Sequence, residues 1–174
     1  MTAIALVVAA TDNGVIGDKG KLPWRIADDM KHFKALTLGR PCIMGRKTWD
    51  SLPKKPLPGR MNIVVTRDSA LAPAGALVAH SFDEALARAS AERPEEISVI
   101  GGAELYAAAL GHATRIHLTE VHGVFSGDAT FEFDRTAWHE IAREDRATAD
   151  GLRYSFVTLE RRSLLKAAED RIPR

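Results

Sequence analysis

Residues 4–10 form an unbroken apolar run, and a turn-forming cluster at residues 11–14 ends it. A run without polar alternation is typical of a strand that is covered on both faces, as in parallel sheets with helices on each side. This run constrains the fold more than any other segment, and it predicts a central strand. We expect an α/β fold of three layers, in which a mostly parallel twisted sheet is flanked by helices and antiparallel strands follow at the C-terminal end.

Further strands and helices are expected where apolar runs lie between clusters of glycine, proline and polar residues. Strands are expected at residues 42–44, 62–66, 77–79, 96–100 and 115–120, and helices before Gly39, after Gly45, at residues 82–91 and at residues 103–110. Residues 138–144 and 152–161 are expected to pair as a hairpin. We expect a single domain over residues 1–161 and a weakly helical C-terminal tail over residues 162–174.

Composition excludes several classes of protein. The chain has 174 residues, 27% of them charged, with a formal net charge of +1, so nothing indicates a partner such as nucleic acid or an anionic membrane. A single cysteine, Cys42, excludes an internal disulfide and a cysteine-based metal cluster, and no metal site is predicted. The apolar start lacks the basic region of a signal peptide, and no apolar run is long enough to span a membrane. We expect a cytoplasmic monomer.

The helix before Gly39 carries two adjacent acids, Asp28 and Asp29. At about 100° per residue, Asp29 falls at about −60° from Ile26, on the same side as Phe33, whereas Asp28 falls at about 200°. The negative charge of Asp28 complements the helix dipole, which accounts for it fully. Dipole compensation gives no reason to place Asp29 on the apolar face. A carboxylate there costs several kcal/mol unless something pairs with it, so we expect either a cationic partner from the protein or a ligand.

Seven short motifs follow one another in an order and spacing that resemble the bacterial dihydrofolate reductases over residues 4–161. The motifs are Val15-Ile16-Gly17, Leu22-Pro23-Trp24, Asp29 with Phe33, Ile43-Met44-Gly45-Arg46-Lys47-Thr48-Trp49, Pro56-Leu57-Pro58-Gly59-Arg60, Val99-Ile100-Gly101-Gly102 and Leu118-Thr119-Glu120. The resemblance implies NADPH-dependent reduction of 7,8-dihydrofolate to 5,6,7,8-tetrahydrofolate. Hydride would pass to C6 with protonation at N5, and dihydrofolate and antifolate inhibitors would be the ligands.

The resemblance also implies roles for individual residues toward the substrate. Asp29 would bind the pterin ring, Thr119 would hydrogen-bond to both Asp29 and the pterin, and Trp24 would orient this region through packing and a bridging water. These three would form the catalytic set. The substrate-binding residues would be Val7, Val8, Asp29, Met30, Phe33, Leu52, Leu57, Arg60 and Thr119. Arg60 would grip the glutamate α-carboxylate, for which the guanidinium fork is well suited.

Two junctions of the strand–glycine–helix type, at Gly45 and at Gly101-Gly102, offer backbone N–H groups to phosphates. From the residues alone, Arg46 and Lys47 are equally well explained as solvated basic residues. In the family the Gly101-Gly102 bond is cis, and Thr66 and Arg67 match contacts to the 2′-phosphate of NADPH. The implied cofactor-binding residues are Ala9, Ile16, Gly45, Arg46, Lys47, Thr48, Thr66, Arg67, Ile100, Gly101, Gly102, Ala103, Glu104, Leu105 and Tyr106.

The glycine-rich residues 12–21 are expected to form a mobile loop without packed elements. This loop is either a plain surface connection or, by the resemblance, a lid that pairs with Gly127 and Asp128. Three positions depart from the family pattern. Ala103 replaces a third glycine, Glu104 replaces a frequent arginine, and Met30 replaces a common leucine. Two alternatives stay open. One is a riboflavin-pathway pyrimidine reductase of the same architecture, against which Trp24, Asp29 and Arg60 argue, and the other is a binding module that has lost turnover.

Overall fold

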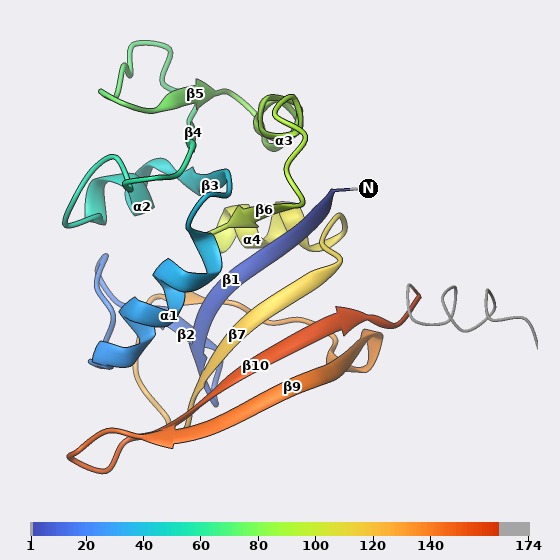
Figure 1. Cartoon of the computed structure of the whole chain (residues 1–174). Helices are drawn as coiled ribbons and strands as arrows, with labels where there is room; N and C mark the ends of the chain where they lie inside the picture. Colours follow the sequence, from blue (N-terminus) through green and yellow to red (C-terminus); the bar gives the residue numbers. More distant parts are fainter. Residues whose placement is uncertain (1, 164–174) are drawn as a thin grey trace, which may run out of the picture.

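The computed structural model describes residues 2–163, and its main feature is an eight-stranded sheet (Figure 1). The strand order is β5-β4-β3-β6-β1-β7-β10-β9. The bounds are β1 (Ala3–Thr11), β3 (Cys42–Gly45), β4 (Asn62–Val65), β5 (Leu77–Ala79), β6 (Glu96–Val99), β7 (Arg115–Val121), β9 (Trp138–Ala147) and β10 (Arg153–Arg161). The apolar run that predicted a central strand is β1, which pairs in parallel with β6 and β7, so this prediction is confirmed.

The mostly parallel sheet with antiparallel C-terminal strands is also confirmed, because β10 pairs antiparallel with both β7 and β9. The predicted hairpin is the β9–β10 pair. The single-domain assignment for residues 1–161 stays a prediction, and the expected tail beyond residue 163 lies outside the described residues. Within residues 2–163, no helix has the length and apolar character needed to cross a membrane.

In the part of the chain that the structure describes, four α-helices cover the two faces of the sheet: α1 (Ala27–Thr37), α2 (Arg46–Ser51), α3 (Phe82–Ser90) and α4 (Ala103–Leu110). Because side chains alternate along a strand, β1 serves two cores. Leu6 and Val8 pack in a cluster with side chains of α3 and α4, whereas Val7 packs on the other face in a cluster that includes Phe33 of α1 and Trp49 of α2. Cys42, at the start of the strand expected over residues 42–44, is fully buried in this second cluster.

The segment after β1 is more ordered than its glycine content suggests. It contains a short strand, β2 (Val15–Gly17), which pairs antiparallel with β8 (Ala129–Thr130), and Val15 is 3% exposed. The expectation of a loop without packed elements over residues 12–21 is therefore wrong for its middle part. A hydrogen-bonding partner from a distant segment stabilises β2, and sequence patterns within the segment cannot show that partner.

Candidate active site

Helix α1 places Asp29 in the middle of its inward face. Phe33 and Leu36 on either side are half-buried and pack against the cluster around Val7. The helical wheel predicts Met30, at about +40° from Ile26, on the apolar face and His32 on the solvent side, and both predictions are wrong. Met30 is 59% exposed, and His32 is half-buried. The buried face is thus centred near Asp29 itself, because the sheet packs against that side of the helix.

Asp29 and Thr119 meet across the pocket between α1 and β7. The Thr119 hydroxyl donates a hydrogen bond of 2.7 Å to Oδ1 of Asp29, and Thr119 itself is 4% exposed. Burial raises the pKa of the Asp29 carboxyl above its ordinary value, and the hydrogen bond from Thr119 offsets part of this rise. No other group within residues 2–163 bonds to the side chain of Asp29, so Oδ2 is available to a ligand.

The pocket is lined by Val7, Val8, Ala9, Asp29, His32, Phe33, Leu36, His117 and Thr119. Sequence reasoning did not identify His32 and His117 as lining residues, although their spacing carried a signal. His32 lies three residues after Asp29 on a helix, and His117 lies two residues before Thr119 on a strand, so each shares a face with a predicted site residue. His117 is held by a hydrogen bond of 2.8 Å between its Nε2 and the buried Glu96.

An apolar wall extends from the pocket toward the other end of α1. Leu52 and Leu57 pack, half-buried, against the same cluster as Phe33, Leu36 and Ile100. At the far end, the Arg60 Nη1 donates to the Thr37 hydroxyl over 3.0 Å, and its Nε donates to the Pro58 carbonyl over 2.9 Å. Since Thr37 lies eight residues after Asp29, the two recognition groups are separated by about 12 Å along the helix axis.

Trp24 precedes α1 and packs against Phe125 of the loop that follows β7. The indole is 7% exposed and meets the Phe125 ring edge-on, with 5.9 Å between ring centroids. Its Nε1 is buried and has no hydrogen-bond partner among the described residues. A buried donor of this kind is normally satisfied, so the indole N–H is a candidate to bind a ligand atom or an ordered water.

The two predicted glycine junctions lie against each other. The Gly45 N–H donates to the Gly101 carbonyl over 2.8 Å, and the Gly101-Gly102 peptide bond is cis, as the resemblance implied. A Cβ added at Gly45 would lie 3.7 Å from the backbone of Gly101 and Gly102, and one at Gly102 would lie 3.7 Å from the Thr48 hydroxyl. The starts of α2 and α4 therefore form one backbone-lined cradle at the carboxyl ends of β3 and β6.

Basic residues stand beside this cradle. Arg46 pairs with Asp68 over 2.8 Å, which brings the start of α2 to the segment that follows β4 and contains Thr66 and Arg67. Three of the predicted cofactor residues are exposed, namely Lys47, Arg67 and Glu104. Among the described residues, no hydrogen bond or ion pair directs the Glu104 carboxylate toward Arg46. Of the other predicted cofactor residues, Leu105 and Tyr106 are buried, and Ala9, Ile16, Thr48, Thr66 and Ala103 are half-buried.

The lid and its partner loop are joined as the resemblance implied. The Lys19 N–H lies 3.2 Å from each carboxylate oxygen of Asp128. Gly127 packs directly on Gly17 and Val15, so closely that an added Cβ would collide with both. The lid is thus held at its tip by Asp128 and along β2 by pairing with β8.

Comparison with known proteins agrees with this geometry. The family model for dihydrofolate reductase matches residues 3–161. A dihydrofolate reductase of Neisseria meningitidis serogroup B is 47% identical over 159 residues, covering 90% of this chain and 97% of that protein. A dihydrofolate reductase of Mycobacterium tuberculosis is 41% identical over 166 residues, covering 92% and 99%.

A similar fold is found among solved structures. Dihydrofolate reductase from Enterococcus faecalis, complexed with NADP(H) and RAB-propyl, superposes with a TM-score of 0.82 at 32% identity, covering 91% of this chain and 96% of that one. The order of strands, the paired Asp29 and Thr119, and the extent of the family match lead to the same assignment. The chain belongs to the dihydrofolate reductase family.

Proposed function

We propose that this chain reduces 7,8-dihydrofolate to 5,6,7,8-tetrahydrofolate with NADPH, by hydride transfer to C6 and protonation at N5. The observation that carries the proposal is Asp29, a carboxylate in an apolar pocket with one oxygen held by Thr119 and the other available. A flat ring that presents two adjacent N–H donors would bond to Oδ2 and to the remaining lone pair of Oδ1, and would thereby satisfy the negative charge. The pterin N3–H and 2-amino group form such a pair.

The apolar wall and Arg60 are placed to bind the parts of the substrate beyond the pterin ring. Leu52, Leu57 and Phe33 offer hydrophobic contact to a benzoyl ring, and Arg60 stands beyond them as a cation for the glutamate α-carboxylate. Met30, exposed at the start of α1, stays a predicted contact at the rim of the pocket. Val8 borders the pocket next to Val7, although its side chain packs on the other face of the sheet, and it stays a predicted contact.

The residues at the glycine cradle fit NADPH. The backbone at Gly45, Gly101 and Gly102 leaves the close approach that a pyrophosphate requires, because side chains are absent there. Arg46, Thr66 and Arg67 lie at the same edge and favour a 2′-phosphate. Ile100, which is 8% exposed, would pack against the nicotinamide. When bound, NADPH supplies the hydride.

Residues of the chain would orient the pterin ring, which accepts the hydride, and favour its protonation. The charge on Asp29 favours the protonated form of a ring that it binds, and the low polarity of the pocket strengthens this effect. Asp29 binds the edge of the pterin that is remote from N5, so we infer that the proton reaches N5 through water. The unpartnered Trp24 N–H is suited to hold such a water. The lid formed around β2 would exclude bulk solvent.

The test is a direct assay of the purified chain, which we expect to act as a monomer. NADPH and dihydrofolate are mixed and absorbance is followed at the nicotinamide band, with methotrexate in a parallel sample and NADH in another. We expect the absorbance to fall rapidly with NADPH, more slowly with NADH, and not at all when methotrexate is present. If the chain binds NADPH stoichiometrically but the absorbance does not fall on adding dihydrofolate, the proposal is contradicted and a non-catalytic binding module is supported.

A further inference from the structure

The first turn of α1 carries the residue on which the proposed function depends, yet little within the helix holds that turn. Ile26 at the N-cap makes no side-chain capping bond, and Thr37, at the opposite end, is the one fully buried residue of the helix. A helix N-terminus without a cap is weaker by about 1 kcal/mol and tends to fray. Contacts outside the helix must therefore hold Asp29 against Thr119.

Those contacts come from the C-terminal hairpin. The Tyr154 hydroxyl on β10 donates to Oδ2 of Asp28 over 2.9 Å, and the Arg146 Nη1 on β9 lies 3.2 Å from the same oxygen. One turn later, the His32 ring stacks on Phe156 of β10, with 3.9 Å between centroids and 18° between planes. Asp28, explained from sequence by the helix dipole alone, is thus bound to two strands at the far edge of the sheet.

The bond to Tyr154 differs from an ordinary surface contact. Tyr154 is 2% exposed and packs with Phe156 and Trp24 in an apolar cluster, and its hydroxyl donates to Asp28 at the border of that cluster. The tyrosine lowers the pKa of Asp28, burial opposes this, and Arg146 lowers it further, so the carboxylate is charged at neutral pH. The exposed ion pair between Arg146 and Asp28 contributes little to stability by itself. The hydroxyl of the buried Tyr154 is held rigidly, so its hydrogen bond fixes the position of the Asp28 carboxylate.

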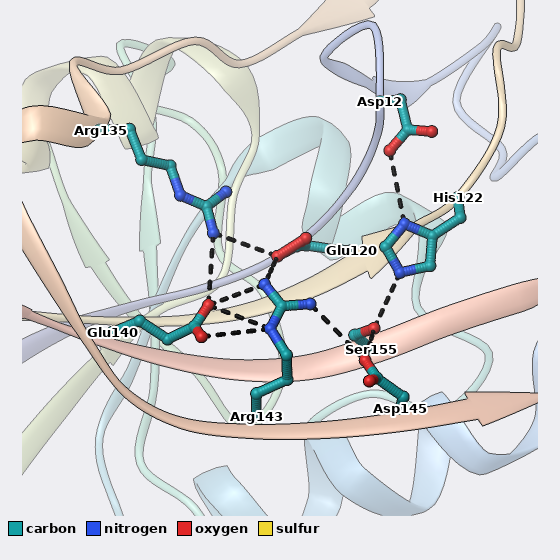
Figure 2. Close-up of polar contacts among 8 residues, drawn as sticks. All are labelled: Asp12, Glu120, His122, Arg135, Glu140, Arg143, Asp145 and Ser155. Atoms are coloured by element: carbon teal, nitrogen blue, oxygen red, sulfur yellow. Dashed lines mark hydrogen bonds and ion pairs between the residues drawn. The ribbon is translucent and has the colours of Figure 1, made fainter.

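The hairpin presents a second, separate network on its other face. Figure 2 shows Arg143 between Glu120 and Glu140, with Arg135 and Asp145 nearby. Nη2 of Arg143 lies 2.6 Å from Oε1 of Glu120 and 2.7 Å from Oε1 of Glu140. Strand register places Arg143 opposite Val157 and Arg146 opposite Tyr154, so the two arginines point to opposite faces. Among the described residues, Arg143 bonds to Glu120, Glu140 and Asp145 and to no residue of α1, which makes it a matched control.

We propose that Asp28 and Tyr154 are positioning residues for this enzyme: their hydrogen bond docks the first turn of α1 on β10 and thereby sets the place of the Asp29 carboxylate. The proposal rests on the proposed function, in which Asp29 binds the pterin. Asp28 and Asp29 are adjacent in the same turn, so displacement of one moves the other. A misplacement of about 1 Å in a binding group can reduce catalysis by up to about 10²-fold.

The first experiment compares Tyr154→Phe with Arg143→Gln in the full chain. Tyr154→Phe keeps the ring in its cluster and removes the donor to Asp28. We expect its kcat/KM for dihydrofolate to fall about tenfold, mainly through KM, while NADPH affinity is unchanged. Arg143→Gln should lower the midpoint of chemical unfolding at least as much and leave KM for dihydrofolate unaltered. An equal effect of both variants on KM would assign Tyr154 a merely structural role and overturn the proposal.

The second experiment tests whether the effect passes through Asp29. If it does, Tyr154→Phe should change kcat/KM much less in an Asp29→Asn background, because the group being positioned is already lost. Asp28→Asn, which keeps an acceptor for Tyr154, should retain more activity than Asp28→Ala. If the losses in kcat/KM from Tyr154→Phe and Asp29→Asn are additive, or if both Asp28 variants lose equal activity, the proposed role of the Asp28–Tyr154 hydrogen bond is contradicted.

A third measurement is independent of turnover. In the ligand-free chain, a carbon-13 NMR titration of the Asp29 carboxyl should show a lower pKa in Tyr154→Phe than in wild type, because a displaced turn becomes more hydrated. Arg143→Gln should leave this pKa unchanged. An unchanged Asp29 pKa in Tyr154→Phe would overturn the proposed role of the Asp28–Tyr154 hydrogen bond. If the wild-type chain does not turn over dihydrofolate, the proposed function is refuted instead.

Discussion

The Thr119 hydroxyl lies 2.7 Å from the Asp29 carboxylate, although 90 residues separate the two in sequence. This hydrogen bond joins α1 to β7, a strand next to the central β1, and therefore ties the recognition acid to the most buried part of the sheet. It leaves one carboxylate oxygen available inside an apolar pocket. The pair thus combines a fixed position with an incompletely satisfied charge, which is the condition for binding a ligand with two donors.

Asp29→Asn should abolish most of the activity while leaving the fold intact. The amide can still accept from Thr119, but it carries no charge to favour a protonated pterin, so kcat should fall by about 10²- to 10³-fold at neutral pH. Steady-state turnover measures the loss, and fluorescence titration with NADPH checks that cofactor affinity is retained. A rate within a few-fold of wild type would refute the role of Asp29.

The same substitution should make the chain more stable at neutral pH. Burial raises the pKa of Asp29 in the folded state above its unfolded value, so ionisation disfavours the folded state. This penalty is absent below the ordinary pKa of an aspartate, appears as pH rises from that value through the raised folded pKa, and is complete above it. Thermal unfolding of Asp29→Asn should show a higher Tm than wild type at pH near 7, with the difference vanishing at acidic pH.

Arg60→Ala should weaken substrate binding without slowing hydride transfer. Arg60 stands about 12 Å from Asp29 along the helix and is oriented by Thr37 and Pro58, so it is remote from the reacting ring. Loss of a charge-assisted contact worth about 1.5–3 kcal/mol should raise KM for dihydrofolate about 10- to 100-fold. A reduced pterin without the glutamate is the control substrate, and its KM should not respond. A loss confined to the single-turnover rate would contradict the assignment.

Gly127→Ala should disturb the lid. An added methyl group would collide with the Gly17 carbonyl and with Val15, both in β2, and would force β2 away from β8. We expect a hydride-transfer rate lowered about tenfold or more, because closure over the nicotinamide site is impaired. Gly111→Ala is the matched control, since its φ is −67° and nothing lies within 4 Å of the added atom. Stopped-flow measurement of a single turnover separates the two variants.

Local sequence signals predicted much of this architecture because they report physics that acts within a few residues. The apolar run of β1, the glycine junctions before α2 and α4, and the turn between β9 and β10 each specify a local conformation, and their bounds in the structure differ from expectation by only a few residues. The inward orientation of Asp29 followed from helical periodicity in the same way. The family motifs then pointed to the ligands.

Other features depend on partners that are distant in the chain. Met30 and His32 lie near the two edges of the buried face of α1, and only the position of the sheet determines that Met30 is exposed and His32 stacks on Phe156. The pairing of β2 with β8 likewise requires the 127–130 segment to meet residues 15–17.

The clearest division is between the two acids of α1. The sequence by itself determined that Asp29 faces inward and Asp28 outward, because the rotation per residue of a helix is a local property. Only the tertiary structure decided their partners, Thr119 for Asp29 and Tyr154, 126 residues away, for Asp28. The geometry of these hydrogen bonds depends on strand order and register, which no local pattern encodes.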